Sequence, residues 1–334
     1  MKKRVLYSLS LLFFFAQLHS QDAEFNNVNH SLVFLNPSFS GSNGYLRNQT
    51  DYRNQWPSLP GTFVFFNTCF DGYIKPLHGG ISFSAFSNNI ARGLIKQNKF
   101  SLAYAQYFSL RDSSLKIIPS VQLTYGLNTL DKNELSFGGP SYPSYGLPTT
   151  WTSLPAGQVH YWDLSAGIVF KAWTSYFGAA LFNILEPNIS FAGVYKTPMR
   201  GVIHASHNEW INRHAKINVF LSYTMQGTNS WLNLRVLNSN YNNPFMWGMG
   251  YKAYLGNDPK VVDIFKGRNN VSFYLGLRQK AFTVNYSFDF QPSKLSGNTA
   301  GSHELSISIS LKRKDDAQRL SWQEKMERNC LERK

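Results

Sequence analysis

Apolar and polar residues alternate one by one in the C-terminal part of the chain. Between residues 281 and 290 every second position is apolar, namely Phe282, Val284, Tyr286, Phe288 and Phe290. Segments 271–278 and 305–312 repeat this pattern, with hydroxyl, amide or charged residues at most of the intervening positions. Because successive side chains of a β-strand point to opposite faces, each segment is predicted to be a strand with one apolar and one polar face.

Similar segments extend toward the N-terminus and give about 14 strands, an even number that fits a closed bacterial barrel. If both chain ends face the periplasm, the long connections 131–161, 183–199, 255–269 and 291–302 all face outside, as in outer-membrane barrels. The short first connection, 57–60, departs from this asymmetry. The predicted strands are 45–56, 61–70, 79–87, 99–110, 116–129, 162–172, 175–182, 200–206, 215–225, 231–237, 245–254, 270–279, 281–290 and 303–312.

Alternation alone also fits a soluble β-sandwich, but two features favour lipid. The polar faces carry small hydroxyl residues with isolated charges, as expected of a barrel interior. Aromatic residues gather near the predicted strand ends, where interfacial girdles lie, at Trp56, Trp151, Trp162, Trp173, Trp231 and Trp247. After residue 20, no apolar run reaches the roughly 18 residues of a membrane helix. We therefore predict an all-β fold, a transmembrane antiparallel outer-membrane β-barrel.

The N-terminus has the layout of a secretory signal peptide. Lys2, Lys3 and Arg4 precede the apolar residues 5–18, and the small Ser20 precedes Gln21. A retained anchor is the alternative. The predicted organisation is a signal peptide (1–20), an N-terminal periplasmic or plug segment (21–44), the outer-membrane barrel (45–313) and a periplasmic tail (314–334).

The composition limits the partners and the chemistry. The chain has a formal net charge of +14, and only 16% of its residues are charged. Export makes nucleic acid an implausible partner, so anionic glycolipid, peptidoglycan or an acidic protein fits better. The histidines are scattered and match no catalytic or metal motif. We predict no catalytic, cofactor or metal site and no enzyme activity, and we expect Cys69 and Cys330 to be free thiols.

Alternation places a set of charged residues on the inward faces. These make the predicted lumen basic, which suits either an anion-selective channel or a lumen that is filled. The filled lumen is favoured because the bulky Trp231, Tyr254 and Tyr274 also point inward. The predicted lumen-facing charges are Asp163, Lys171, Lys216, Arg235, Lys252, Arg278, Asp289 and Lys312.

Several short elements follow one another along residues 21–312. They are Gln21, Asp22 and Phe25; Leu35, Asn36, Pro37 and Gly41; Arg53, Gln55 and Trp56; Asp71, Gly79 and Gly80; Tyr286, Phe288 and Asp289; and Ser302, His303 and Glu304. In this order they resemble the PorP/SprF family, outer-membrane barrels of type IX secretion and gliding motility in Bacteroidetes. The family usually has Tyr and Ala near the NPxxxG turn, where this chain has Ser38, Phe39 and Ser40.

The resemblance implies a non-enzymatic outer-membrane component in contact with lipid. Such a component would support secretion or surface anchoring of an adhesin and link to periplasmic type IX secretion proteins. An anion-selective or solute channel is the alternative.

Six residues are candidate partner-binding or structural anchors. Asn36 and Pro37 are predicted to fix a bend in the N-terminal segment, and Arg53 and Trp56 to act as anchors, although a role in folding alone would explain each of these four. In the tail, Trp322 and Met326 are four residues apart and would share one face of a partner-binding helix. A solvated tail is the alternative.

Overall fold

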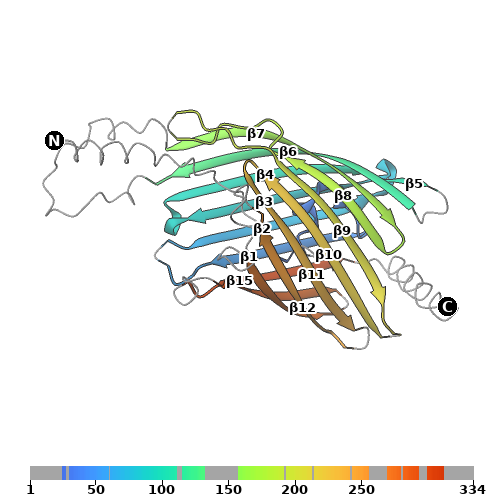
Figure 1. Cartoon of the computed structure of the whole chain (residues 1–334). Helices are drawn as coiled ribbons and strands as arrows, with labels where there is room; N and C mark the ends of the chain where they lie inside the picture. Colours follow the sequence, from blue (N-terminus) through green and yellow to red (C-terminus); the bar gives the residue numbers. More distant parts are fainter. Residues whose placement is uncertain are drawn as a thin grey trace, which may run out of the picture.

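The computed structural model describes residues 25–27, 30–59, 61–110, 115–131, 157–191, 193–212, 214–240, 243–255, 269–279, 281–292 and 299–311. In these parts of the chain, antiparallel strands form one sheet that closes into a barrel (Figure 1). The closed ring has 14 strands, and one extra short strand lies outside it. The predicted fold class is therefore confirmed.

Each strand of the ring pairs with its neighbours in sequence. In the described residues the strands are β1 (Leu46–Gln55), β2 (Phe63–Ile74), β3 (Gly79–Ile90), β4 (Ile95–Gln106), β5 (Phe108–Leu110), β6 (Leu115–Leu130), β7 (Gln158–Ala172), β8 (Ser175–Phe182), β9 (Arg200–Trp210), β10 (Ala215–Gln226), β11 (Asn229–Asn240), β12 (Phe245–Tyr254), β13 (Asn270–Arg278), β14 (Phe282–Phe290) and β15 (Ser302–Leu311).

Two pairings complete the ring. The first strand pairs with the last, with Leu46 opposite Leu311 and Gln55 opposite Ser302. The second pairing joins β4 directly to β6 and leaves β5 outside. We call the end where β1 begins and β15 ends the inner end, because both chain ends and the short connections of bacterial barrels face the periplasm. The opposite end is the outer end.

Several predicted strands differ from the structure at their ends by up to four residues, and two of these differences have a visible cause. The fourth predicted strand ran to residue 110, but β4 ends at Gln106, and β5 pairs instead with the start of β6. Between them, the backbone N–H of Tyr107 donates to the carbonyl of His78, outside the β3–β4 ladder. The predicted strand 200–206 continues to Trp210 in the structure. The prediction ended too early because the outward face turns polar at His207 and Glu209, where the apolar alternation is lost.

The two faces of the barrel differ in the way expected of a barrel in lipid. Large apolar side chains are exposed on the outside along most strands, for example Phe83, Leu123 and Leu275. The interior holds buried amides, hydroxyls and charges. Trp162, Trp173 and Trp247 are exposed, but Trp231 is buried inside the barrel, so its prediction as a girdle residue is wrong and its inward prediction is right.

Within the described residues, no helix has the length and apolarity needed to cross a membrane. The short helices there are α2 (Leu32–Leu35), η2 (Pro37–Phe39), η3 (Lys75–Leu77) and η4 (Ala91–Gly93). The predicted signal peptide, the tail with Trp322 and Met326, the inward Lys312 and the girdle residue Trp151 lie outside the described residues.

We expect Leu123→Arg, at an exposed apolar position in the middle of β6, to destabilise the barrel in lipid by about 2–4 kcal/mol, because a charge would enter hydrocarbon. Leu123→Met keeps the side chain apolar and should cost less than about 1.5 kcal/mol. Urea titration of the barrel folded into liposomes measures both variants. Equal stability of the two would contradict the outward placement of Leu123.

Candidate functional site in the barrel lumen

The first described stretch of the chain lies inside the barrel. Residues 25–27 and 30–44, which we call the N-terminal segment, pack against lumen-facing side chains. At the outer end, Phe25 packs with Phe65 and Phe86, near the start of β2 and the end of β3. From there the segment runs down the lumen to the start of β1 at the inner end.

The outer part of the segment is held through its backbone. The buried carboxylate of Glu304 on β15 accepts hydrogen bonds from the N–H groups of Asn26 and Asn27, both at 2.8 Å. The carbonyl of Asn26 accepts a hydrogen bond of 3.1 Å from the Arg235 guanidinium on β11. Buried backbone groups need such partners, and here strands from separate parts of the ring supply them.

Arg53 joins this network from β1. Its guanidinium lies 3.1 Å from the Glu304 carboxylate and 2.6 Å from the Asp289 carboxylate, and all three side chains are buried. The contact with Glu304 is a charge-assisted hydrogen bond, a kind roughly twice as strong as a neutral one, and the contact with Asp289 is an ion pair. Also on β1, Asp51 accepts a hydrogen bond of 2.6 Å from the Ser31 hydroxyl. The segment is thus tied to both strands that close the ring.

Asn36 and Pro37 form the bend in the middle of the segment. The Asn36 side chain accepts a hydrogen bond from the Ser38 N–H at 2.9 Å, and Pro37 occupies the first turn of η2. The Asn36 amide also lies within hydrogen-bond distance of the carbonyls of Ile168 and Ala179, at 3.3 and 3.0 Å. Asn36 therefore caps the turn and fastens it to the wall.

Glycines in the wall allow this close approach. A Cβ atom added at Gly167 would lie 2.1 Å from the Asn36 side-chain oxygen, and one at Gly80 would lie 1.9 Å from the Ser40 carbonyl. Gly41 adopts a φ of +68°, a backbone conformation that favours glycine. The NPxxxG turn can approach the wall this closely because Gly80 and Gly167 have no side chain.

The inner part of the segment is held by a second ion pair. The N–H of Gly41 donates to the Asp71 carboxylate at 2.9 Å, and the same carboxylate pairs with Arg47 at 2.8 Å. The Ser40 hydroxyl lies 2.8 Å from that of Ser82. The segment is therefore anchored at its outer part, at its bend and at its inner part.

The predicted anchors lie in different places. Asn36, Pro37 and Arg53 are buried in the lumen network. Trp56 lies in the connection after β1, where it packs on Phe63 with ring centroids 5.9 Å apart and its N–H donates to the Gly301 carbonyl. Trp56 is thus part of the outer rim and does not contact the N-terminal segment in the described contacts.

The predicted lumen charges fall into two groups. Arg235 binds the N-terminal segment directly and Asp289 pairs with Arg53, whereas the other five belong to β7, β10, β12 and β13. Of those five, Asp163 accepts N–H groups of Asn183 and Leu185, and Lys252 lies over the Trp231 and Tyr254 rings. Lys171, Lys216 and Arg278 are more exposed, and all three belong to strand ends at the inner end.

The fully buried charges of the lumen balance each other, and the more exposed bases of the predicted set lie at the inner end. The described residues include five buried carboxylates beside five buried bases. The prediction missed several of these, although β1 shows them by alternation at Arg47, Gln49, Asp51 and Arg53. The full set is Asp51, Asp71, Asp163, Asp289 and Glu304 with Arg47, Arg53, Arg200, Arg235 and Lys252.

Cys69 offers a native reporter of this packing, because its buried thiol lies in one apolar cluster with Val33 and Phe39 of the segment. Glu304→Ala removes acceptors whose hydrogen bonds contribute about 1.5–3 kcal/mol each. We expect Cys69 to react at least about tenfold faster with a thiol reagent, since 1.4 kcal/mol is a factor of ten.

This labelling is measured by mass spectrometry in a Cys330→Ser background. The matched control is Ser308→Ala, which changes another lumen-facing residue of β15. Unchanged Cys69 reactivity in Glu304→Ala would contradict the anchoring role of Glu304.

Comparisons with known proteins show both the family and remote structural similarity. None of the curated proteins compared with the chain matches it. Among solved structures, the chain is similar to the CymD monoaromatic hydrocarbon channel, with a TM-score of 0.49 and 11% identity over 88% of this chain and 95% of that one. It is also similar to the outer membrane protein Omp33 of Acinetobacter baumannii, with a TM-score of 0.46 and 7% identity over 80% of this chain and 96% of that one.

The family comparison covers nearly the whole barrel. The model described as "Type IX secretion system membrane protein PorP/SprF" matches residues 17–309. The resemblance found in the sequence is therefore confirmed, together with the predicted location in the outer membrane. The chain belongs to the PorP/SprF family of type IX secretion system membrane proteins.

Proposed function

We propose that this barrel is a non-enzymatic, non-conducting scaffold of the type IX secretion machinery. It supports the secretion or surface anchoring of a partner protein such as an adhesin, and it links the outer membrane to periplasmic secretion proteins. The observation that carries the scaffold role is the N-terminal segment, which fills the lumen and is held by buried hydrogen bonds and ion pairs.

A filled lumen argues against conduction. The cavities left beside the segment include one of about 450 Å³ toward the inner end and one of about 70 Å³ toward the outer end, and their described linings share no residue. To open a continuous path, the segment would have to leave several buried partners at once. Each unsatisfied buried group costs about 1–3 kcal/mol, so a stable open state is disfavoured.

The ends of the barrel are then the surfaces that can meet partners. Outer-membrane barrels carry their longer loops outside, and here the connection between β6 and β7 is the longest in the ring. Its residues 132–156, rich in Gly, Pro, Ser and Tyr, lie outside the described part of the chain. In this proposal the outer loops contact the exported protein, and the inner end contacts periplasmic components.

We expect a strain that lacks this gene to lose at least one protein from its surface, because that protein would no longer be exported or anchored. Surface proteomics of the deletion strain and of a strain complemented with the intact gene measures this loss. An unchanged set of surface proteins in the deletion strain would contradict the proposed function.

In planar lipid bilayers, the purified full-length protein should give no steady current, because the segment occupies the lumen. Glu304→Ala should give brief openings, and Ser308→Ala should remain silent like the intact protein. A steady anion-selective current through the intact protein would instead establish the channel function and overturn the scaffold proposal.

A further inference from the structure

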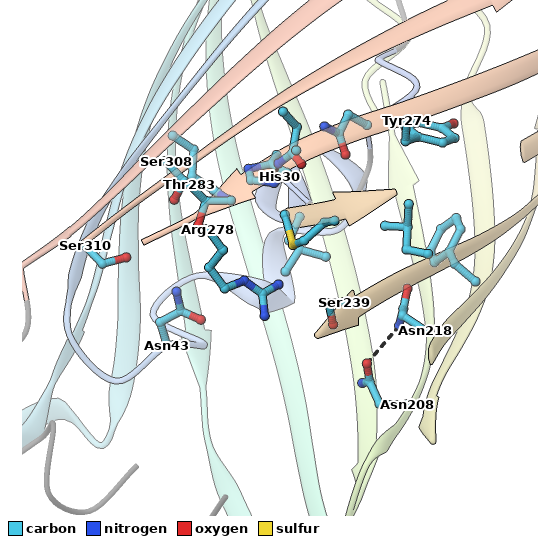
Figure 2. A pocket seen from close by; sticks show the side chains of 18 of the residues that line it. His30, Asn43, Asn208, Asn218, Ser239, Tyr274, Arg278, Thr283, Ser308 and Ser310 are labelled. Carbon is cyan, nitrogen blue, oxygen red and sulfur yellow. Dashed lines mark hydrogen bonds between the residues drawn. The ribbon is translucent and has the colours of Figure 1, made fainter. Parts of the chain in front are cut away.

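A cavity of about 450 Å³ lies between the N-terminal segment and strands of the second half of the ring. Figure 2 shows His30 and Tyr274 at one side of it and Arg278, Asn43 and Ser310 around the other. Arg278 and Gln279 are exposed at the end of β13, whereas the lining residues Asn27, Gln49 and His204 are buried. The cavity therefore leads from the inner rim into the lumen and ends at the N-terminal segment.

The walls carry groups that can bind a peptide backbone. Amide side chains both donate and accept hydrogen bonds, and hydroxyls do the same. Neighbouring strands position some of them for each other: the Asn218 amide donates to Ser206 at 2.9 Å and to Asn208 at 3.1 Å. Six such residues around the cavity are Asn43, Asn208, Asn218, Asn238, Ser239 and Ser308.

The charge of the cavity has one sign. Its lining includes Lys216 of β10 and Arg278 of β13, and the described lining residues include no Asp or Glu. Arg47, which also lies 2.8 Å from Asp71, is a third base in the lining. The smaller cavity at the outer end differs, because Asp163 lies there with Lys99 and Arg200. Positive charge without acidic residues in the described lining thus distinguishes this cavity from the smaller one at the outer end.

We propose that this cavity binds an acidic peptide segment of a periplasmic protein. Its volume lies within the roughly 300–1,000 Å³ of ligand pockets, enough for a short peptide. The bases would pair with its carboxylates, and the amides would bind its backbone. A lipid headgroup is disfavoured because most of the lining residues belong to the inward faces of the strands and to the N-terminal segment. This inference rests on the proposed function for the periplasmic source of the peptide.

The tail of this chain is a poor candidate for the occupant. Residues 312–334 contain eight Lys or Arg and five Asp or Glu, so the tail has the same sign of charge as the cavity. Like charges in a confined space repel each other. Charge complementarity therefore favours an acidic segment from another protein.

Binding of a dye-labelled tetraglutamate peptide to the full-length protein in neutral detergent, measured by fluorescence anisotropy, tests the proposal. The double variant Lys216→Gln/Arg278→Gln should weaken binding at least about tenfold. Lys252→Gln is the matched control, because it removes the same kind of charge from the lumen outside this cavity, and it should change the Kd less than about twofold. A tetraglutamine peptide should not bind.

A second measurement avoids charge variants. In a Cys330→Ser background, tetraglutamate should protect Ser239→Cys from a thiol reagent, and tetraglutamine should not. Three results would overturn the proposal: no binding to the intact protein, equal weakening by Lys252→Gln, or complete displacement of the peptide by millimolar inorganic phosphate. Because the assay uses purified protein, its failure would leave the secretion role standing, and an unaltered deletion strain would leave the peptide site standing.

Discussion

The carboxylate of Glu304 accepts hydrogen bonds from two backbone N–H groups of the N-terminal segment and from Arg53, and the arrangement of the lumen depends on it. Removing a carboxylate from water costs several kcal/mol, which only close partners can offset. Here the partners come from the segment and from β1. The same bonds that stabilise this charge therefore keep the lumen filled.

A closed ring creates this situation. In lipid, every backbone polar group of the strands must be paired within the sheet, so strand edges are not available for binding. The interior is the place where polar side chains can gather, and in this chain they bind the N-terminal segment. A cavity remains beside the segment at the inner end. Its described lining has bases and no Asp or Glu, whereas the fully buried charges of the lumen balance each other.

Local periodicity was enough to predict the barrel, because each strand records its two environments in alternate residues. It was weakest where those environments change, as at His207, where the outward face becomes polar and β9 continues unrecognised. The Asn36–Pro37 bend was visible as a turn motif. Its attachment to Ile168 was not, since the contact joins residues 132 positions apart and nothing in either local pattern encodes the pairing. The alternation did not single out Glu304, which entered the prediction only as part of the family resemblance.

The N-terminal segment also bears on how the ring could come apart. The junction of β1 with β15 joins the two ends of the barrel sequence. Asp51 on one side of this junction binds Ser31, and Glu304 on the other binds Asn26 and Asn27. The segment thus acts as an internal staple across the seam. Lateral release of a cargo into the bilayer between these two strands would require the staple to be withdrawn first.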